Sequence, residues 1–347
     1  MLLYLNFLGT TIAFDVAADS EDAFAPVRSF FRCLLGPEPT GTPDFYVRVV
    51  ARASDRGPDE GCPVVIRESS APEFTFRALL SRNGDRWTYR NEQTVLETPV
   101  DAADDRFFRL AITPASSIQV IDFVRDLVIR TEETAGTVVL HASAVVRDGE
   151  AFAIAGPKGA GKTTTLLSVL SHGGWDYLTG DKLFCRPENG EIVVQAWRDY
   201  PYVGVGTLRA NPRLAAKVRE NAAPNLDELD PRHKILLDPD MFESWLGADF
   251  NPSPRHLAGL LLPRIQPGEP LRVESIAEQN ARWSALNTIV DRSVDTTFFG
   301  WQHYLVPDYA AFYRTLAELR PLLSGLDMIR LTGTLDIDLD TVLKDAR

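Results

Sequence analysis

Short runs of alternating apolar and polar side chains fill the first 115 residues, and this period of two predicts strands with one buried face. The clearest run is residues 74–80, which leads into a hairpin at Asn83–Gly84. One helix is expected between Ser20, which is followed by two acidic residues, and the Gly36–Pro37 pair. Residues 1–115 are therefore predicted to form a small N-terminal α/β domain.

The apolar period changes after this region. Residues 118–133 place apolar side chains at helical spacing, behind the capping pair Ser116–Ser117 and ahead of Ala135–Gly136. This pattern predicts a helix over residues 116–136 that links two domains.

Residues 137–347 are predicted to form the second domain. Two apolar runs, residues 138–146 and 151–155, flank an Asp148–Gly149 turn, which is a strong hairpin signal. A helical pattern follows, and then a short strand that ends in Asp181. Since the hairpin supplies an antiparallel neighbour, the sheet is expected to be mixed and partly antiparallel.

Later segments complete the prediction for this domain. Residues 199–230 contain glycines and prolines at close intervals, and they are expected to form a loop that faces the substrate. The run at residues 256–262 predicts a strand that stops at Pro263. A helix through residues 309–320 and a strand at residues 328–333 close the chain.

The segment from Gly156 to Thr163 matches the phosphate-binding pattern G-x-x-x-x-G-K-[ST] at every fixed position. It also lies between a buried strand and a helix, as the pattern requires. In such a loop, backbone N–H groups surround phosphate oxygens, the lysine reaches the β- and γ-phosphates, and the hydroxyl ligates Mg²⁺. The predicted nucleotide-binding residues are Gly156, Pro157, Lys158, Gly159, Ala160, Gly161, Lys162, Thr163 and Thr164.

Composition restricts the partners. A net charge of −12 argues against a nonspecific nucleic-acid or membrane surface, because anionic surfaces attract dense Lys and Arg. The three cysteines are an odd number without C-x-x-C spacing, which indicates neither a disulfide framework nor a zinc cluster. This cysteine usage fits a reducing cytoplasm, so we expect a cytoplasmic protein. No apolar run is long enough to span a bilayer, so we also expect it to be soluble.

The run from residue 140 to residue 184 resembles the kinase domain of HPr kinase/phosphorylase, whose diverged relatives share the architecture of PEP carboxykinases. The shared features are His141 before the hairpin, the hairpin itself, the phosphate loop, and the acid-ended strand. This resemblance implies an ATP- and Mg²⁺-dependent kinase acting on serine or threonine hydroxyls, often as a homo-oligomer. HPr kinases place two adjacent aspartates where this chain has Gly180–Asp181.

The resemblance assigns catalytic roles to Lys162, Asp181 and His141, and metal binding to Thr163 and Asp181. Asp181 could also accept the hydroxyl proton, or it could be a turn residue that caps backbone N–H groups. His141 could orient Asp181 or contact the γ-phosphate, or it could be a hydrogen-bonded core residue. Lys158 could touch phosphate or remain solvated.

Two further groups of residues are weaker candidates. Asp199 is a candidate second acid on the metal side, and residues 232–234 are a candidate phosphate clamp. Residues 298–304 are aromatic-rich and could stack on a peptide or a base, although core packing is the simpler interpretation.

The leading functional hypothesis is a kinase for a Ser/Thr hydroxyl of a peptide or protein. One alternative is a kinase for a small hydroxylated metabolite. The other alternative is a nucleotide-binding regulatory switch without transferase activity. The single aspartate at position 181, where HPr kinases have a pair, favours this alternative.

Overall fold

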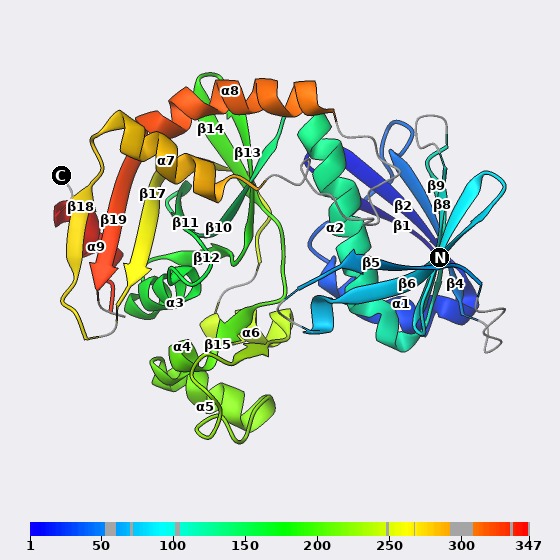
Figure 1. Cartoon of the computed structure of the whole chain (residues 1–347), viewed down its shortest axis with the longest axis horizontal. Helices are drawn as coiled ribbons and strands as arrows, with labels where there is room; N and C mark the ends of the chain where they lie inside the picture. Colours follow the sequence, from blue (N-terminus) through cyan, green and yellow to red (C-terminus); the bar gives the residue numbers. More distant parts are fainter. Residues whose placement is uncertain are drawn as a thin grey trace. The chain divides into compact units, whose positions relative to one another are not determined.

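The computed structural model describes residues 1–52, 60–69, 72–100, 105–247, 250–266, 268–291, 308–333 and 336–345. It divides into two compact units (Figure 1). Unit 1 contains Met1–Gly136 and Arg292–Phe312, and unit 2 contains Thr137–Asp291 and Tyr313–Arg347. The aromatic segment at residues 298–304 lies outside the described residues.

Unit 1 contains a nine-stranded sheet with the order β3-β1-β2-β4-β9-β8-β7-β6-β5. β2, β4 and β9 pair in parallel and their other neighbours pair antiparallel. The strands are β1 (Leu2–Phe7), β2 (Thr10–Val16), β3 (Leu35–Gly36), β4 (Phe45–Ala51), β5 (Cys62–Arg67), β6 (Phe76–Asn83), β7 (Arg86–Arg90), β8 (Thr94–Pro99) and β9 (Phe107–Ile112). The helices are α1 (Glu21–Phe30) and α2 (Ser117–Thr134).

Helix α1 is shorter than predicted. It ends at Phe30 and not at Gly36, because Leu35 and Gly36 pair with Leu5 and Tyr4 as the edge strand β3. The predicted hairpin after β6 is confirmed, since Asn83 pairs with Arg86 across the turn.

Unit 2 contains an eight-stranded mixed sheet, which confirms the predicted α/β class. Its strands are β10 (Val138–Arg147), β11 (Glu150–Ala155), β12 (Asp176–Thr179), β13 (Lys182–Glu188), β14 (Glu191–Ala196), β17 (Arg255–Ile265), β18 (Arg272–Ser275) and β19 (Asp327–Gly333). A separate pair contains β15 (Tyr202–Gly204) and β16 (Lys234–Leu236). The helices are α3 (Lys162–His172), α4 (Val205–Arg209), α5 (Pro212–Asn221), α6 (Pro239–Leu246), α7 (Gln279–Ile289), α8 (Tyr309–Gly325) and α9 (Leu339–Asp345).

Unit 2 contains the predicted hairpin at Asp148–Gly149 and a second hairpin between β13 and β14. β10 and β11 pair antiparallel through a turn in which Asp148 and Gly149 both have positive φ, at 52° and 86°. β13 and β14 are joined in the same way through Asn189 and Gly190, at 52° and 83°. These tight turns fix the register, because a two-residue turn leaves no room for a slip.

β11 also pairs in parallel with β17, so the loop after β11 opens at the edge where β17 ends. β17 runs on to Ile265, two residues past the predicted stop at Pro263. The proline is accommodated because the β11 pairing ends at Leu261, and only β19 pairs beyond it.

The prediction of a loop for residues 199–230 is wrong for much of the segment, which contains α4 and α5. Asn211 accepts a hydrogen bond from the Leu214 N–H and Pro212 follows it, so α5 begins with a capped first turn. Figure 1 shows α4, α5, α6 and β15 grouped together beside the sheet of unit 2.

Apolar side chains of α3 hold the phosphate-loop helix against the sheet. Leu166 and Val169 are buried in one cluster with Ile154 of β11 and Leu261 of β17. Burying side chains of this size removes about 1.5–3 kcal/mol each of unfavourable apolar hydration. The start of α3 is thereby fixed relative to both strands. Among the described residues, no helix has the length and hydropathy needed to cross a membrane.

Candidate functional site

Residues 156–161 form the loop between β11 and α3. Gly159 and Gly161 have φ values of +84° and +103°, which L side chains rarely adopt. The Ala160 carbonyl accepts a hydrogen bond from the Ile265 N–H at 3.0 Å, which ties the loop to the end of β17. The first intrahelical bond of α3 runs from the Thr165 N–H to the Gly161 carbonyl, so the preceding N–H groups have no acceptor within the helix.

Gly161 also has no room for a side chain. A Cβ built there would lie 2.3 Å from Cγ1 of Ile265, whereas a Cβ at Gly159 would meet no atom within 4 Å. We expect Gly161→Ala to destabilise the protein by about 2–4 kcal/mol, through strain and overpacking together. Gly159→Ala should cost only about 1–2 kcal/mol, because strain acts alone. Chemical denaturation of both variants measures the difference, and equal losses would contradict the packing argument.

Lys162 is the cation of the loop. Its Nζ donates to the Gly156 carbonyl at 2.9 Å, so the side chain lies folded over the loop. Burial lowers the pKa of Lys162, and the positive charges of Lys234 and Lys182 lower it further, whereas Asp181 opposes them. A group of cations that share one region is stabilised by a bound anion.

The two threonines that follow Lys162 differ. The Thr164 hydroxyl lies 2.7 Å from the Thr207 hydroxyl of α4, so this side chain connects α3 to α4. The Thr163 hydroxyl makes no hydrogen bond within the described part of the chain and remains open to a ligand. Pro157 and Lys158 are exposed at the loop surface.

His141 and Asp181 meet beside the loop. His141 lies on β10 opposite Lys182, and the Asp181 carbonyl accepts from the Ala142 N–H at 3.0 Å. This pairing places Nδ1 of His141 2.9 Å from Oδ1 of Asp181, with both side chains about 40% exposed. Lys182 lies 3.8 Å from the other carboxylate oxygen of Asp181 and also pairs with Asp291. Asp181 is therefore oriented by two neighbours and remains accessible.

Asp199 lies next to Gly180. A Cβ built on Gly180 would be 3.0 Å from Oδ2 of Asp199, and the Tyr177 hydroxyl donates to Oδ1 at 3.2 Å. Burial raises the pKa of Asp199 to about 7, the charge of Asp181 adds to the shift, and the hydrogen bond from Tyr177 opposes it. The site thus has two carboxylates, one at position 181 and one opposite position 180.

The segment that carries Asp199 is anchored by its neighbour. The Arg198 side chain is buried and donates to both carboxylate oxygens of Glu243 on α6 at 2.8 Å. It also pairs with Asp240. A bidentate buried pair of this kind holds the backbone in one place.

We expect the Asp199 carboxyl to make stability fall with rising pH. Its raised pKa means that, between about pH 4 and pH 7, the folded protein retains a proton that the unfolded chain has lost. The folded state is therefore favoured at the acid end of this window, and the advantage is lost as pH rises through 7. Asp181 and Glu243 face this carboxyl as charges of the same sign, and Tyr177 as a neutral donor.

Asp199→Asn should flatten that fall by on the order of 2 kcal/mol, after allowance for partial exposure. The measurement is the free energy of unfolding of both proteins at several pH values between 4 and 8. Parallel curves for the wild type and the variant would contradict the prediction.

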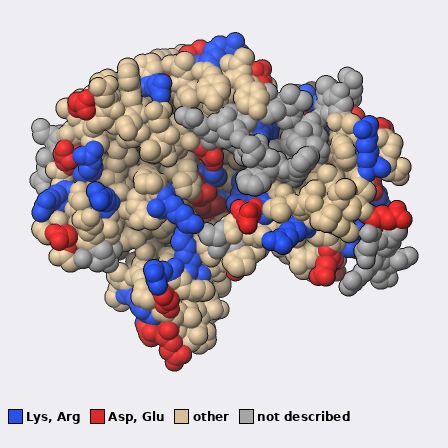
Figure 2. All heavy atoms as spheres, viewed as in Figure 1, with Lys and Arg blue, Asp and Glu red and all other residues tan. Residues whose placement is uncertain are grey.

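Among the candidate basic residues 232–234, Lys234 interacts electrostatically with Lys158 and Lys162 of the loop. Burial lowers its pKa, the charge of Lys158 adds to this effect, and Asp181 opposes it. Arg232 is instead 92% exposed and pairs with Asp230 at 3.1 Å. Figure 2 shows Lys and Arg side chains gathered over the part of unit 2 where Figure 1 draws β15 and α4.

Two other histidines pair with acidic side chains. His172 lies 2.6 Å from Asp336, and His256 lies 2.9 Å from Glu191. In the described ranges, no cluster of three or more His, Cys, Asp or Glu residues could hold a metal ion by itself. His303 lies outside those ranges.

No protein-family model matches the chain, and no curated protein matches it either. Among solved structures, the chain is similar to the Hpr(Ser) kinase/phosphatase from Coxiella burnetii, with 13% sequence identity and a TM-score of 0.23. The alignment covers 40% of this chain and 72% of that chain. The likeness is weak and distant.

Proposed function

We propose that residues 137–347 form a kinase domain that transfers the γ-phosphoryl group of ATP to a Ser/Thr hydroxyl of a peptide or protein. The observation that carries this proposal is the phosphate loop with Lys162 beside the carboxylates of Asp181 and Asp199. A phosphoryl transferase needs this combination of cations for phosphate and carboxylates for a metal and an acceptor hydroxyl.

The loop residues fit the phosphates of a nucleotide. The first N–H groups of α3 have no acceptor within the helix, and the glycines keep the backbone accessible. Lys162 supplies a partly desolvated positive charge, which interacts with phosphate more strongly than a solvated one. Lys158 and Lys234 add charge at the rim.

Thr163 and Asp181 would hold Mg²⁺, since hydroxyl and carboxylate oxygens are the ligands that this ion prefers. When bound, the ion would neutralise negative charge on the phosphate oxygens. The protein does not need to supply three ligands to the ion, because Mg²⁺ in such sites is held largely by substrate phosphates and water.

Other residues of the chain orient the two carboxylates and position the acceptor. His141 fixes the carboxylate of Asp181 through the 2.9 Å contact, and Lys182 restrains its second oxygen. Asp199 supplies a second carboxylate, held by Tyr177. Transfer also requires that the acceptor hydroxyl is held in line with the γ-phosphate. We assign that positioning to the pair of aspartates.

The presence of both Asp181 and Asp199 also distinguishes between the alternative functions. The hypothesis of a regulatory switch drew its support from a lone aspartate, and a second carboxylate opposite Gly180 favours transfer over slow hydrolysis. A small hydroxylated metabolite remains the alternative acceptor, because the aspartates recognise the hydroxyl and not the molecule that carries it.

The test is incubation with γ-labelled ATP, Mg²⁺ and a library of serine- and threonine-containing peptides, followed by mass spectrometry. Each peptide is matched by a copy in which alanine replaces the hydroxyl residue. Label on the hydroxyl peptides and not on their alanine copies is the expected result. Free labelled phosphate without any labelled peptide would contradict the proposal and favour the switch.

A further inference from the structure

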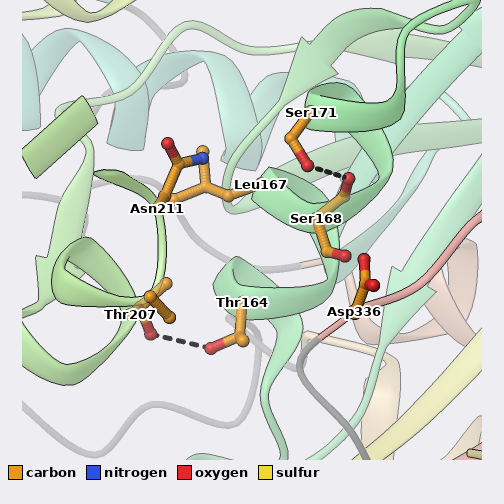
Figure 3. Close-up of a pocket in the computed structure, with 8 residues that line it drawn as sticks. Thr164, Leu167, Ser168, Ser171, Thr207, Asn211 and Asp336 are labelled. Carbon is orange, nitrogen blue, oxygen red and sulfur yellow. Dashed lines mark hydrogen bonds between the residues drawn. The ribbon is translucent and has the colours of Figure 1, made fainter. Parts of the chain in front are cut away.

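A cavity of about 200 Å³ opens beside the first turns of α3 (Figure 3). Thr164, Leu167 and Ser171 line it from one face of α3, at the helical spacing of three, four and seven residues. Thr207 and Asn211 line it from the segment around α4, and Asp336 closes it on a third side. All of these residues belong to unit 2.

We propose that this cavity binds the base and ribose of the nucleotide whose phosphates the loop holds, an inference that rests on the proposed function. The cavity begins at Thr164, the second residue after Lys162, so it adjoins the phosphate loop directly. It is smaller than the roughly 300–1,000 Å³ of pockets that enclose a whole drug-sized ligand. This size suits a ring system with its sugar, while the phosphates lie over the loop.

The chemistry of the walls fits an uncharged nucleoside. Leu167 and the exposed Ala210 form the apolar part of the lining. The Ser171 hydroxyl donates to the Ser168 carbonyl, and the Thr164 and Thr207 hydroxyls bond to each other. One of these three hydroxyl protons therefore stays available to a ligand, and each hydroxyl oxygen can still accept. Such a mixture of apolar surface and a few placed polar groups is typical of cofactor sites. The described residues that line the cavity include no Lys or Arg, which argues against a second phosphate there.

Asn211 is a directed donor. Its Oδ1 accepts from the Leu214 N–H at 3.1 Å, which fixes the amide and leaves Nδ2 to donate. Within the described residues, Nδ2 has no acceptor, and Figure 3 shows the amide beside Leu167 at the cavity. Purine rings carry nitrogen acceptors that such a donor recognises.

Asp336 is a directed acceptor. Its side chain is 82% exposed and contacts His172 through Oδ1 at 2.6 Å. Each carboxylate oxygen has two lone pairs, so a carboxylate can accept several hydrogen bonds at once. A carboxylate at the rim suits the ribose hydroxyls, which are donors.

The test compares the Kd of ATP with the Kd of inorganic tripolyphosphate, both with Mg²⁺, by calorimetry. Asn211→Ser removes the amide donor and replaces it with a shorter hydroxyl that remains a good helix cap. Ala210→Trp fills part of the cavity, because Ala210 is an exposed residue of its lining. Asn221→Ser, at the other end of α5, is the matched control. We expect ATP binding to weaken about three- to tenfold in Asn211→Ser and more than tenfold in Ala210→Trp, with tripolyphosphate unchanged within about twofold.

A second comparison isolates the ribose. ATP and 2′,3′-dideoxy-ATP should differ severalfold in binding to the wild type, and this ratio should approach one in Asp336→Ala. Because both ligands carry the same charge, the ratio is free of long-range electrostatic effects.

The outcomes separate the two ideas. If Asn211→Ser and Ala210→Trp weaken ATP and tripolyphosphate equally, or weaken neither, the inference is overturned while the phosphate site stands. If the wild type binds tripolyphosphate as tightly as ATP, the nucleoside cavity is again overturned. If the wild type binds neither ligand, the proposed function fails as well.

Discussion

Lys162→Ala should weaken nucleotide binding by about 100-fold or more, because it removes the charge that the loop presents to the β- and γ-phosphates. The fold should not suffer. Among the described residues, the Lys162 side chain donates only to the Gly156 carbonyl. Burial also lowers its pKa, so its surroundings disfavour the charged form until an anion binds. Calorimetric titration with ATP gives the affinity, and thermal unfolding gives the stability.

Two further lysine variants make this measurement specific. Lys217→Ala removes an equal charge from the exposed side of α5, where Lys217 pairs with Glu220 at 3.8 Å, and it should leave the affinity unchanged. Lys158→Ala removes an exposed charge of the loop itself and should cost only a few-fold, since solvent screens it. A Lys162→Ala protein that binds ATP as tightly as the wild type would overturn the assignment of the loop.

Local patterns predicted the framework of the site. The hairpin at Asp148–Gly149 and the loop from Gly156 to Thr163 are short-range features, and Gly149, Gly159 and Gly161 have the positive φ values that favour glycine. The structure places them between β10, β11 and α3 as the sequence indicates. Their chemical role still follows from the motif and not from the fold.

Asp199 was harder to find because it joins the site through a long-range pairing. Leu183 pairs with Ala196 across the hairpin, and continuing that register by three residues on each strand brings Gly180 opposite Asp199. The position of the Asn189–Gly190 turn therefore predicts that Gly180 and Asp199 face each other. Counting outward from a two-residue turn identifies the partner of a glycine that stands where a second acid is expected.

Other features needed the tertiary structure. The start of α5 was marked by Asn211–Pro212, but the frequent glycines and prolines around it favoured a loop. The pairing of the Thr164 and Thr207 hydroxyls joins residues 43 apart in sequence, and no local pattern encodes it. The cavity beside α3 depends on the position of α5 and on the Thr164–Thr207 contact, so it could not be predicted from the sequence.

Asp181→Asn should abolish Mg²⁺-dependent transfer while nucleotide binding persists. The amide keeps the shape of the carboxylate but loses the charge that would hold the metal, and removal of such an interaction costs on the order of 100- to 1,000-fold in rate. Nucleotide affinity without Mg²⁺ should stay the same or rise, because a negative charge near Lys162 is lost. Asp176→Asn, an exposed position at the start of β12, is the matched control and should retain full activity.

The companion variant His141→Phe separates orientation from metal binding. It removes the group 2.9 Å from Oδ1 of Asp181 but leaves the carboxylate charge, so we expect a smaller loss of rate, about tenfold, with the Mg²⁺ dependence retained. Single-turnover rates measured across a range of Mg²⁺ concentrations distinguish the two variants. If Asp181→Asn transferred phosphate at the wild-type rate, the carboxylate at position 181 would have no part in transfer. The metal-binding carboxylate would then have to come from Asp199 alone.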